Sequence, residues 1–140
     1  CHYPLEGYNE FARLLQPLIE RDLYGAKPAV PITPPNLKRA QFVSVARDTL
    51  TLEFDQPVRW DEKLVSQFYL DGEKDKVLSG SVAGNALTLK LKETSNAKNI
   101  TYLKETSWNQ DNLLWGENGI AALTFCEAPI EATLPSVKKP

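Results

Sequence analysis

The stretch VLSGSVAGNALTLKL, residues 77–91, decides the fold. In its second half Leu87, Leu89 and Leu91 alternate with polar residues, and this period of two is typical of a strand with one buried face. Residues 77–82 predict a second strand. Gly84-Asn85 between the two suits the positive φ angles of a tight turn. The stretch therefore predicts an antiparallel β-hairpin.

The same alternation recurs on both sides of this hairpin. Leu50, Leu52 and Phe54 alternate with Thr51 and Glu53, which predicts a strand over residues 49–55. Further strands are expected at residues 40–46, 66–70, 98–104 and 121–126. Seven short strands separated by turn signals predict a mainly β fold, an Ig-like antiparallel β-sandwich over residues 37–130. We expect the polar residues 131–140 to form a flexible tail.

Residues 5–24 follow a different period. Apolar residues recur there at three- and four-residue steps, which predicts one amphipathic helix preceding the sandwich. The stripe consists of Tyr8, Phe11, Ala12, Leu15, Leu18, Ile19 and Leu23. Pro17 predicts a kink or a restart, and Gly25 a C-terminal cap. Residues 26–36 contain four prolines, which predicts a stiff extended linker between a helical part, residues 1–25, and the sandwich.

Composition narrows the classes of function. The chain has 140 residues, 24% of them charged, and a formal net charge of −2, the profile of a soluble globular protein. No dense basic cluster predicts nucleic-acid binding, no apolar run reaches the ~20 residues of a membrane span, and no signal peptide opens the sequence. Cys1 and Cys126 could form a disulfide, but the sequence favours two unpaired thiols.

The sequence has one histidine, His2, and a lone terminal imidazole supplies neither a nucleophile nor an orienting partner. However, the block CHYPLEGY at residues 1–8, followed by the amphipathic helix, resembles the last conserved block of SGNH-type hydrolases. The resemblance implies that His2 is a catalytic base. It places the matching aspartate two residues before Cys1, and the nucleophilic serine and the oxyanion-hole residues in earlier blocks that this sequence does not include.

A second resemblance lies near the other end. Ile100-Thr101-Tyr102, Asn112-Leu113 and GENGIAALTF at residues 116–125 are similar to the closing segment of sialate O-acetylesterase-like enzymes, which place a β-sandwich after the hydrolase domain. The sequence departs from that pattern at residues 120–122, where Leu-Pro-Ala is more usual. The resemblance implies the C-terminal part of a carbohydrate O-acetylesterase, inactive alone, secreted or periplasmic, without a cofactor, and with the missing hydrolase domain as its partner.

The loop of residues 105–118 holds the candidate substrate-binding residues Trp108, Asn109, Asp111 and Trp115. Indole rings can stack on sugars while amides bind hydroxyls, so a glycan site is one interpretation; tryptophans packed against the sandwich or the missing domain are the favoured one. The loop lacks the alternating acidic spacing of a calcium loop, so no metal is predicted.

Other motifs have structural interpretations. Ser79-Gly80-Ser81 lacks the pattern of a nucleophile elbow and is interpreted as a strand. Asn99-Ile100-Thr101 fits a glycosylation acceptor but lies in an expected strand, and Trp60 is expected at an inter-strand corner. Two alternatives to an esterase part stay open: a stand-alone carbohydrate-binding module and an adhesion-type Ig-like module. In an adhesion-type module, the helix and His2 would be incidental.

Overall fold

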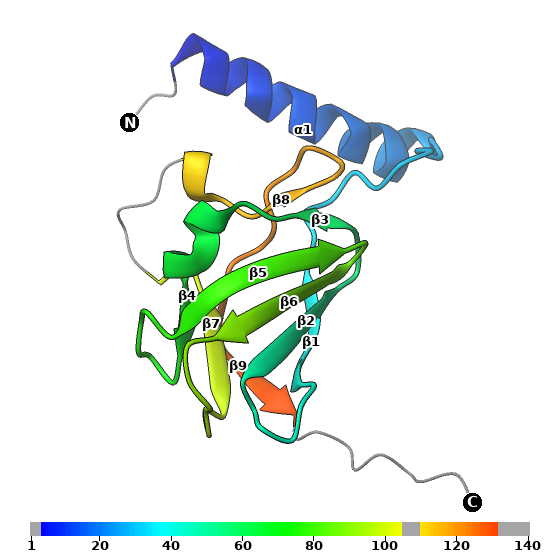
Figure 1. Ribbon diagram of the computed structural model, residues 1–140. Coiled ribbons are helices and arrows are strands. Elements are labelled where there is room, and N and C mark those ends of the chain that lie inside the picture. Colours follow the sequence, from blue (N-terminus) through cyan, green and yellow to red (C-terminus); the bar gives the residue numbers. More distant parts are fainter. Residues whose placement is uncertain (1–3, 105–109, 132–140) are drawn as a thin grey trace, which may run out of the picture. The chain divides into compact units, whose positions relative to one another are not determined.

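A computed structural model describes residues 4–104 and 110–131 of the chain (Figure 1). The chain divides into two compact units, Cys1–Thr33 and Pro34–Pro140. The first contains a single helix in its described part, and the second contains all the strands. Each unit is described by itself below.

Helix α1 spans Leu5–Tyr24, as the apolar periodicity predicts. It begins after Pro4, whose extended backbone cannot continue a helix toward the N-terminus. It ends at Gly25, which adopts the left-handed conformation (φ 69°), and the Ala26 amide donates to the Glu20 carbonyl at 3.0 Å. The helix passes through Pro17 as one element, so the restart considered for this position does not occur.

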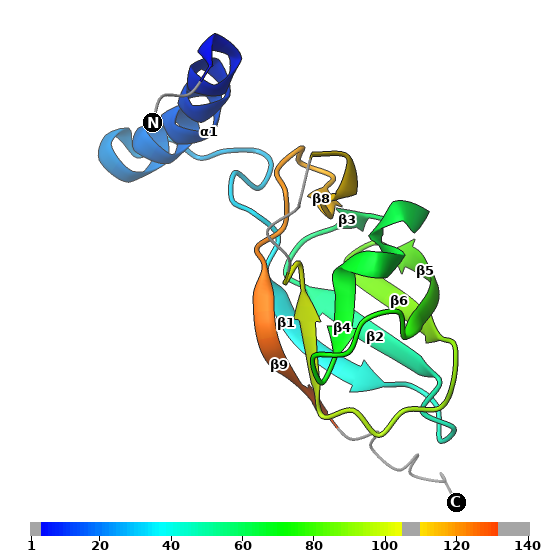
Figure 2. The ribbon, with the colours of Figure 1, turned by 90° about the vertical axis from the view of Figure 1, so that its left-hand side faces the viewer.

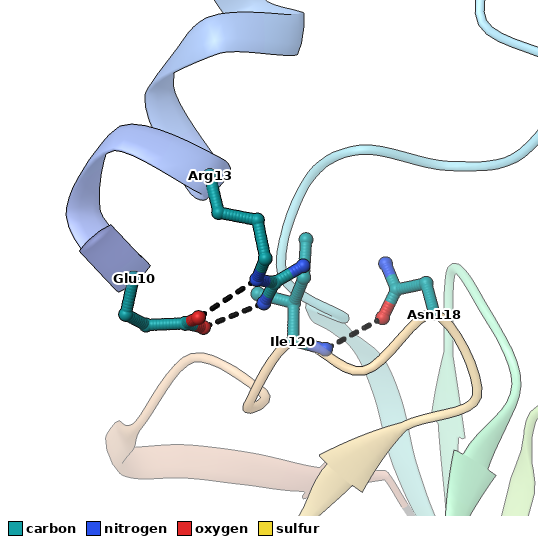
Figure 3. A network of polar contacts seen from close by, with 4 residues as sticks. All are labelled: Glu10, Arg13, Asn118 and Ile120. Atoms are coloured by element: carbon teal, nitrogen blue, oxygen red, sulfur yellow. Dashed lines mark hydrogen bonds and ion pairs between the residues drawn. The ribbon is translucent and has the colours of Figure 1, made fainter. Parts of the chain in front are cut away.

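The surface of α1 is amphipathic but contains no buried residue. Its apolar stripe, including Phe11, Leu15 and Ile19, is exposed. On the polar side Arg13 Nε donates to Glu10 Oε2 at 2.7 Å (Figure 3), and this hydrogen bond lowers the pKa of the Glu10 carboxyl. A pair so exposed contributes little to stability.

The second unit, Pro34–Pro140, is called the β unit here; it holds nine strands in its described part. They are β1 Leu37–Phe42, β2 Thr49–Phe54, β3 Val58–Arg59, β4 Phe68–Leu70, β5 Val77–Ala83, β6 Ala86–Leu91, β7 Asn99–Tyr102, β8 Trp115–Gly116 and β9 Phe125–Glu131. Seven form one sheet in the order β4-β7-β9-β1-β2-β6-β5, and β3 pairs with β8 in a small second sheet.

The predicted hairpin is confirmed as β5 and β6, which pair antiparallel from Ala83 opposite Ala86. Gly84 has the positive φ of 61° that the turn requires. Asn85 ties the turn to the end of β2: its Nδ2 donates to the Phe54 carbonyl at 2.8 Å, and its own carbonyl accepts from the Phe54 amide at 2.9 Å. The two hydrogen bonds to Phe54 at the end of β2 therefore stabilise the turn in addition to its own backbone geometry.

The seven-stranded sheet is nearly closed into a barrel, with β4 and β5 as its two edges (Figure 2). Between these edges lies the 3-10 helix η1, Glu62–Gln67, which inserts Leu64 into the core. Trp60 also lies at this gap: its ring is 6.2 Å from that of Phe68 in β4, and it packs directly on Gly80 in β5. Side chains, rather than a hydrogen-bonded strand pair, complete the wall of the barrel. We call this region the seam.

The core consists of the inward-facing residues of the sheet. Leu50, Leu52 and Phe54 are buried while the residues between them are half-buried, so the predicted alternation of β2 is confirmed. Leu87, Leu89 and Leu91 are buried in β6, where Thr88 is half-buried and Lys90 exposed. Replacing any one of these buried leucines by alanine should cost about 2–5 kcal/mol.

The mainly β prediction is confirmed, whereas the Ig-like sandwich is not. One part of the prediction is wrong: the sheet is mixed, because β9 runs parallel to β1 while pairing antiparallel with β7. Residue alternation identifies strands but not their neighbours, so it could not reveal this. None of the described helices is long and apolar enough to cross a membrane.

Candidate functional site

The loop that holds the candidate glycan-binding residues contributes β8 to the small β3–β8 sheet. Arg59 pairs with Trp115 and Val58 with Gly116, and a further bridge joins Trp115 to Ala121. Before β8 lies the short 3-10 helix η2, Gln110–Asn112. We call residues 110–123 the site loop. Pairing with β3 holds Trp115 on one side, and the bridge to Ala121 within the loop holds it on the other.

Tyr102 anchors the site loop to the core. Its hydroxyl accepts a hydrogen bond of 2.6 Å from the Leu114 amide, and its ring stacks on Phe68 with centroids 5.2 Å apart. Burial raises the pKa of the phenol, an effect that the hydrogen bond from Leu114 partly opposes. The phenol therefore stays neutral in the folded protein well into the alkaline range.

Trp115 is half-buried, and its indole N–H is engaged within the loop. Nε1 donates to the Gln110 carbonyl at 3.2 Å, so the polar end of the ring stabilises the approach of η2 to β8. The ring face is the part of Trp115 that remains suited to a sugar, because stacking needs no hydrogen-bond donor.

Of the other predicted site residues, the structure describes Asp111 alone. Asp111 lies exposed in η2, four residues before Trp115 on the same loop. Trp108, Asn109 and His2 lie outside the described residues, so their placement stays a prediction. Within residues 4–104 and 110–131 no three His, Cys, Asp or Glu side chains gather as a metal site would need. Cys126 is an exposed free thiol.

The sequence analysis missed a polar network around Gln56. This side chain is only 8% exposed, and its Nε2 donates to the Pro34 carbonyl at 3.2 Å while its Oε1 accepts from Asn118 Nδ2 at 3.1 Å. Asn118 Oδ1 in turn accepts from the Ile120 amide at 3.1 Å (Figure 3). Both ends of the Asn118 side-chain amide are thus hydrogen-bonded within the protein. The one signal in the sequence was an amide side chain beside Pro57, and Gln56 lies in the bend between β2 and β3.

A second polar feature is a recess of about 410 Å³ between the residue 70–76 and 91–97 segments. Several of its charges are neutralised locally. Asp71 Oδ1 accepts from the Lys98 and Asn99 amides at 3.1 and 2.9 Å, and Glu73 pairs with Lys76 at 2.7 Å. The recess also lacks an aromatic side chain, so it is a weaker candidate for sugar binding than the site loop.

Comparison with known proteins gives a likeness of fold. No protein-family model and no curated protein matches the sequence. Among solved structures, a carbohydrate acetylesterase from Xanthomonas citri superposes with a TM-score of 0.60 at 16% sequence identity. The match covers 83% of this chain but 27% of that enzyme's chain. The protein therefore has a fold related to that of one part of a carbohydrate esterase.

Proposed function

We propose that this chain is the C-terminal part of a carbohydrate O-acetylesterase, in which residues 1–25 complete the hydrolase domain and the β unit is an accessory domain. The observation that carries the proposal is the fold likeness, in which most of this chain matches about a quarter of a carbohydrate acetylesterase. The resemblance of residues 1–8 to an SGNH block points in the same direction from an independent part of the sequence.

In this proposal the reaction is hydrolysis of an acetyl ester on a sugar. A serine from the hydrolase domain attacks the acyl carbon, and His2 accepts its proton as general base. An aspartate two residues before Cys1 holds the imidazole in the tautomer that can accept. The leaving alkoxide takes the proton from His2, and water then hydrolyses the acyl-enzyme by the same route. This chain supplies one of the three residues and is inactive alone.

The β unit positions glycan through the site loop. Trp115 offers its ring face because its N–H is already bound to Gln110, and Asp111, exposed in η2, provides a carboxylate for sugar hydroxyls. Trp108 and Asn109 are further candidate glycan-binding residues in this proposal. The resemblance to sialate O-acetylesterase-like enzymes is what supports a secreted or periplasmic location.

The proposal is tested first by reading the residues encoded immediately before Cys1. We expect an Asp-x-x-His element that ends at His2, and a Gly-Asp-Ser-type block further upstream. The complete gene product is then assayed with p-nitrophenyl acetate and with acetylated oligosaccharides. His2→Gln should lower kcat by about 10²-fold or more, since a general base contributes about 10²–10⁴-fold.

The opposite results would be equally clear. A signal sequence or another Ig-like repeat directly before Cys1 would remove the catalytic role of His2 and leave a binding or adhesion module. Full esterase activity in the His2→Gln variant would contradict the assignment as well. Acetylesterase activity in the 140-residue chain alone would show that the nucleophile lies within it.

A further inference from the structure

The start of the β unit is held by an unusual set of hydrogen bonds. Three consecutive residues bond to two other segments. The Pro34 carbonyl accepts from Gln56 and Asn36 exchanges bonds with Asp55, both in the connection after β2, while the Pro35 carbonyl accepts from the Leu123 amide at 2.9 Å. Proline has no amide hydrogen, so its carbonyl is its one backbone hydrogen-bonding group. The backbone carbonyls of both prolines are therefore hydrogen-bonded to other residues of the β unit.

Gly116 makes this approach possible. A Cβ at this position would lie 2.7 Å from Pro35 Cγ and 2.5 Å from Asn118 Oδ1, and 3.1 Å from the Ile120 carbonyl. Its φ is not in the left-handed region, so space rather than backbone conformation is what glycine provides here. Pro35 is buried against β8 as a result.

We propose that Gln56, Gly116 and Asn118 form a linker clasp, a set of positioning residues that fixes residues 34–36 and so sets the point at which the proline-rich segment leaves the β unit. Gln56 is the centre of the clasp because it bonds to Pro34 and Asn118 at once. Asn118 connects it to the site loop through Ile120. The exit of the linker and the shape of the site loop are therefore coupled, whatever the function of the protein.

The test is amide hydrogen exchange by NMR on the 140-residue chain. The reporters are the Leu123 amide, which donates to Pro35, and the Asn36 amide, which donates to Asp55 Oδ1 at 2.8 Å. In Gln56→Ala and Asn118→Ala both reporters should exchange about 5-fold faster or more, as expected for the loss of one buried hydrogen bond. The order parameter of Asn36 should fall from about 0.85, the value of rigid backbone.

Two comparisons make the test specific. Asn96→Ala removes an exposed amide of the same unit and should leave both reporters unchanged. The amides of Leu50 and Leu89 in the core should also be unchanged, because the clasp acts locally. Gly116→Ala should accelerate the same reporters; if that variant does not fold, the Gln56 and Asn118 variants decide the matter.

Unchanged exchange at Asn36 and Leu123 in both alanine variants would overturn the proposal. An equal increase at Leu50 and Leu89 would overturn it too, since the network would then be an ordinary part of the global fold. Faster exchange confined to the two reporters supports it.

Discussion

Tyr102 connects the core of the β unit to the site loop through a single hydroxyl. The Leu114 amide is buried with it, and both groups lose water on folding. Removing the hydroxyl therefore leaves a buried donor without its partner, which costs about 1–3 kcal/mol. Tyr102→Phe should lower the free energy of unfolding by that amount in urea titrations at neutral pH. Tyr24→Phe removes an exposed hydroxyl and is the control; an equal loss there would contradict a special role for Tyr102.

The same phenol predicts a dependence of stability on alkaline pH. Its folded pKa is raised above the unfolded value near 10, mainly by burial. The unfolded chain therefore releases this proton at a lower pH than the folded chain does. The contribution of the Tyr102 phenol to the free energy of unfolding is therefore complete below pH ~10, and it is lost as the pH rises further. The difference in unfolding free energy between wild type and Tyr102→Phe should shrink over that range; a difference constant with pH would contradict this.

Gly80 and Trp60 form a second close approach that can be tested. A Cβ on Gly80 would overlap two indole carbons of Trp60, and a rigid ring cannot yield without moving away from the seam. Gly80→Ala should cost about 1–3 kcal/mol, the usual range for overpacking. The cost should largely vanish in a Trp60→Ala background, because neighbouring substitutions are not additive. Additive losses in this double-mutant cycle would show that Trp60 is not the cause.

Among single residues, only part of the candidate site could be predicted from the sequence. The aromatic and amide-rich character of the site loop singled out Trp115 and Asp111. It could not show that the Trp115 N–H is already bound to Gln110, or that Asn118 faces inward to Gln56. Neither side chain belongs to a periodic element, so nothing in the local pattern fixes its direction. Gln56 was missed because it lies in the bend between β2 and β3, where no periodic pattern shows what a polar side chain will bond to.

Among the elements, strands with clear alternation were the predictable ones. β2 and β6 lie where the period of two placed them, because burial of one face dictates that period. β5 was predicted from its place before the Gly84-Asn85 turn. β3 and β8 were missed since a two-residue strand cannot display a period. β9 was expected at 121–126 and occupies Phe125–Glu131, where Pro129 and the positive φ of Glu127 (51°) disturb the alternation.

The turn between β5 and β6 gives a prediction for a whole element. Asn85→Ala removes the hydrogen bond to the Phe54 carbonyl while keeping the backbone one, and should cost about 1 kcal/mol in equilibrium unfolding. Gly84→Val should cost more, because a β-branched residue is strained at a φ of 61°. If Gly84→Val were as stable as wild type, the turn would have to adopt another geometry.

For the whole molecule, the division into two units predicts independent folding. In the described part of the chain, the buried core residues all lie between Ala40 and Ala122, within the β unit. A chain of residues 34–140 should therefore unfold cooperatively with a Tm within a few degrees of the full chain, as followed by circular dichroism. Residues 4–33 alone should be weakly helical, since a helix of this length is marginal in water without packing.

A large drop in Tm on removing residues 1–33 would contradict that independence. It would also mean that the apolar stripe of α1 contributes to the stability of the β unit. An unchanged Tm would leave the stripe as a surface that needs a partner outside this sequence, as the esterase proposal requires.

The seam has a consequence for behaviour in concentrated solution. A sheet that stops at β5 presents an outer row of amides and carbonyls, and such rows recruit strands from other molecules into aggregates. Here η1 and Trp60 lie against that edge, so the packing that completes the barrel also obstructs intermolecular strand addition. Substitutions that loosen the packing of Trp60 should therefore lower the solubility of the protein before they lower its secondary-structure content.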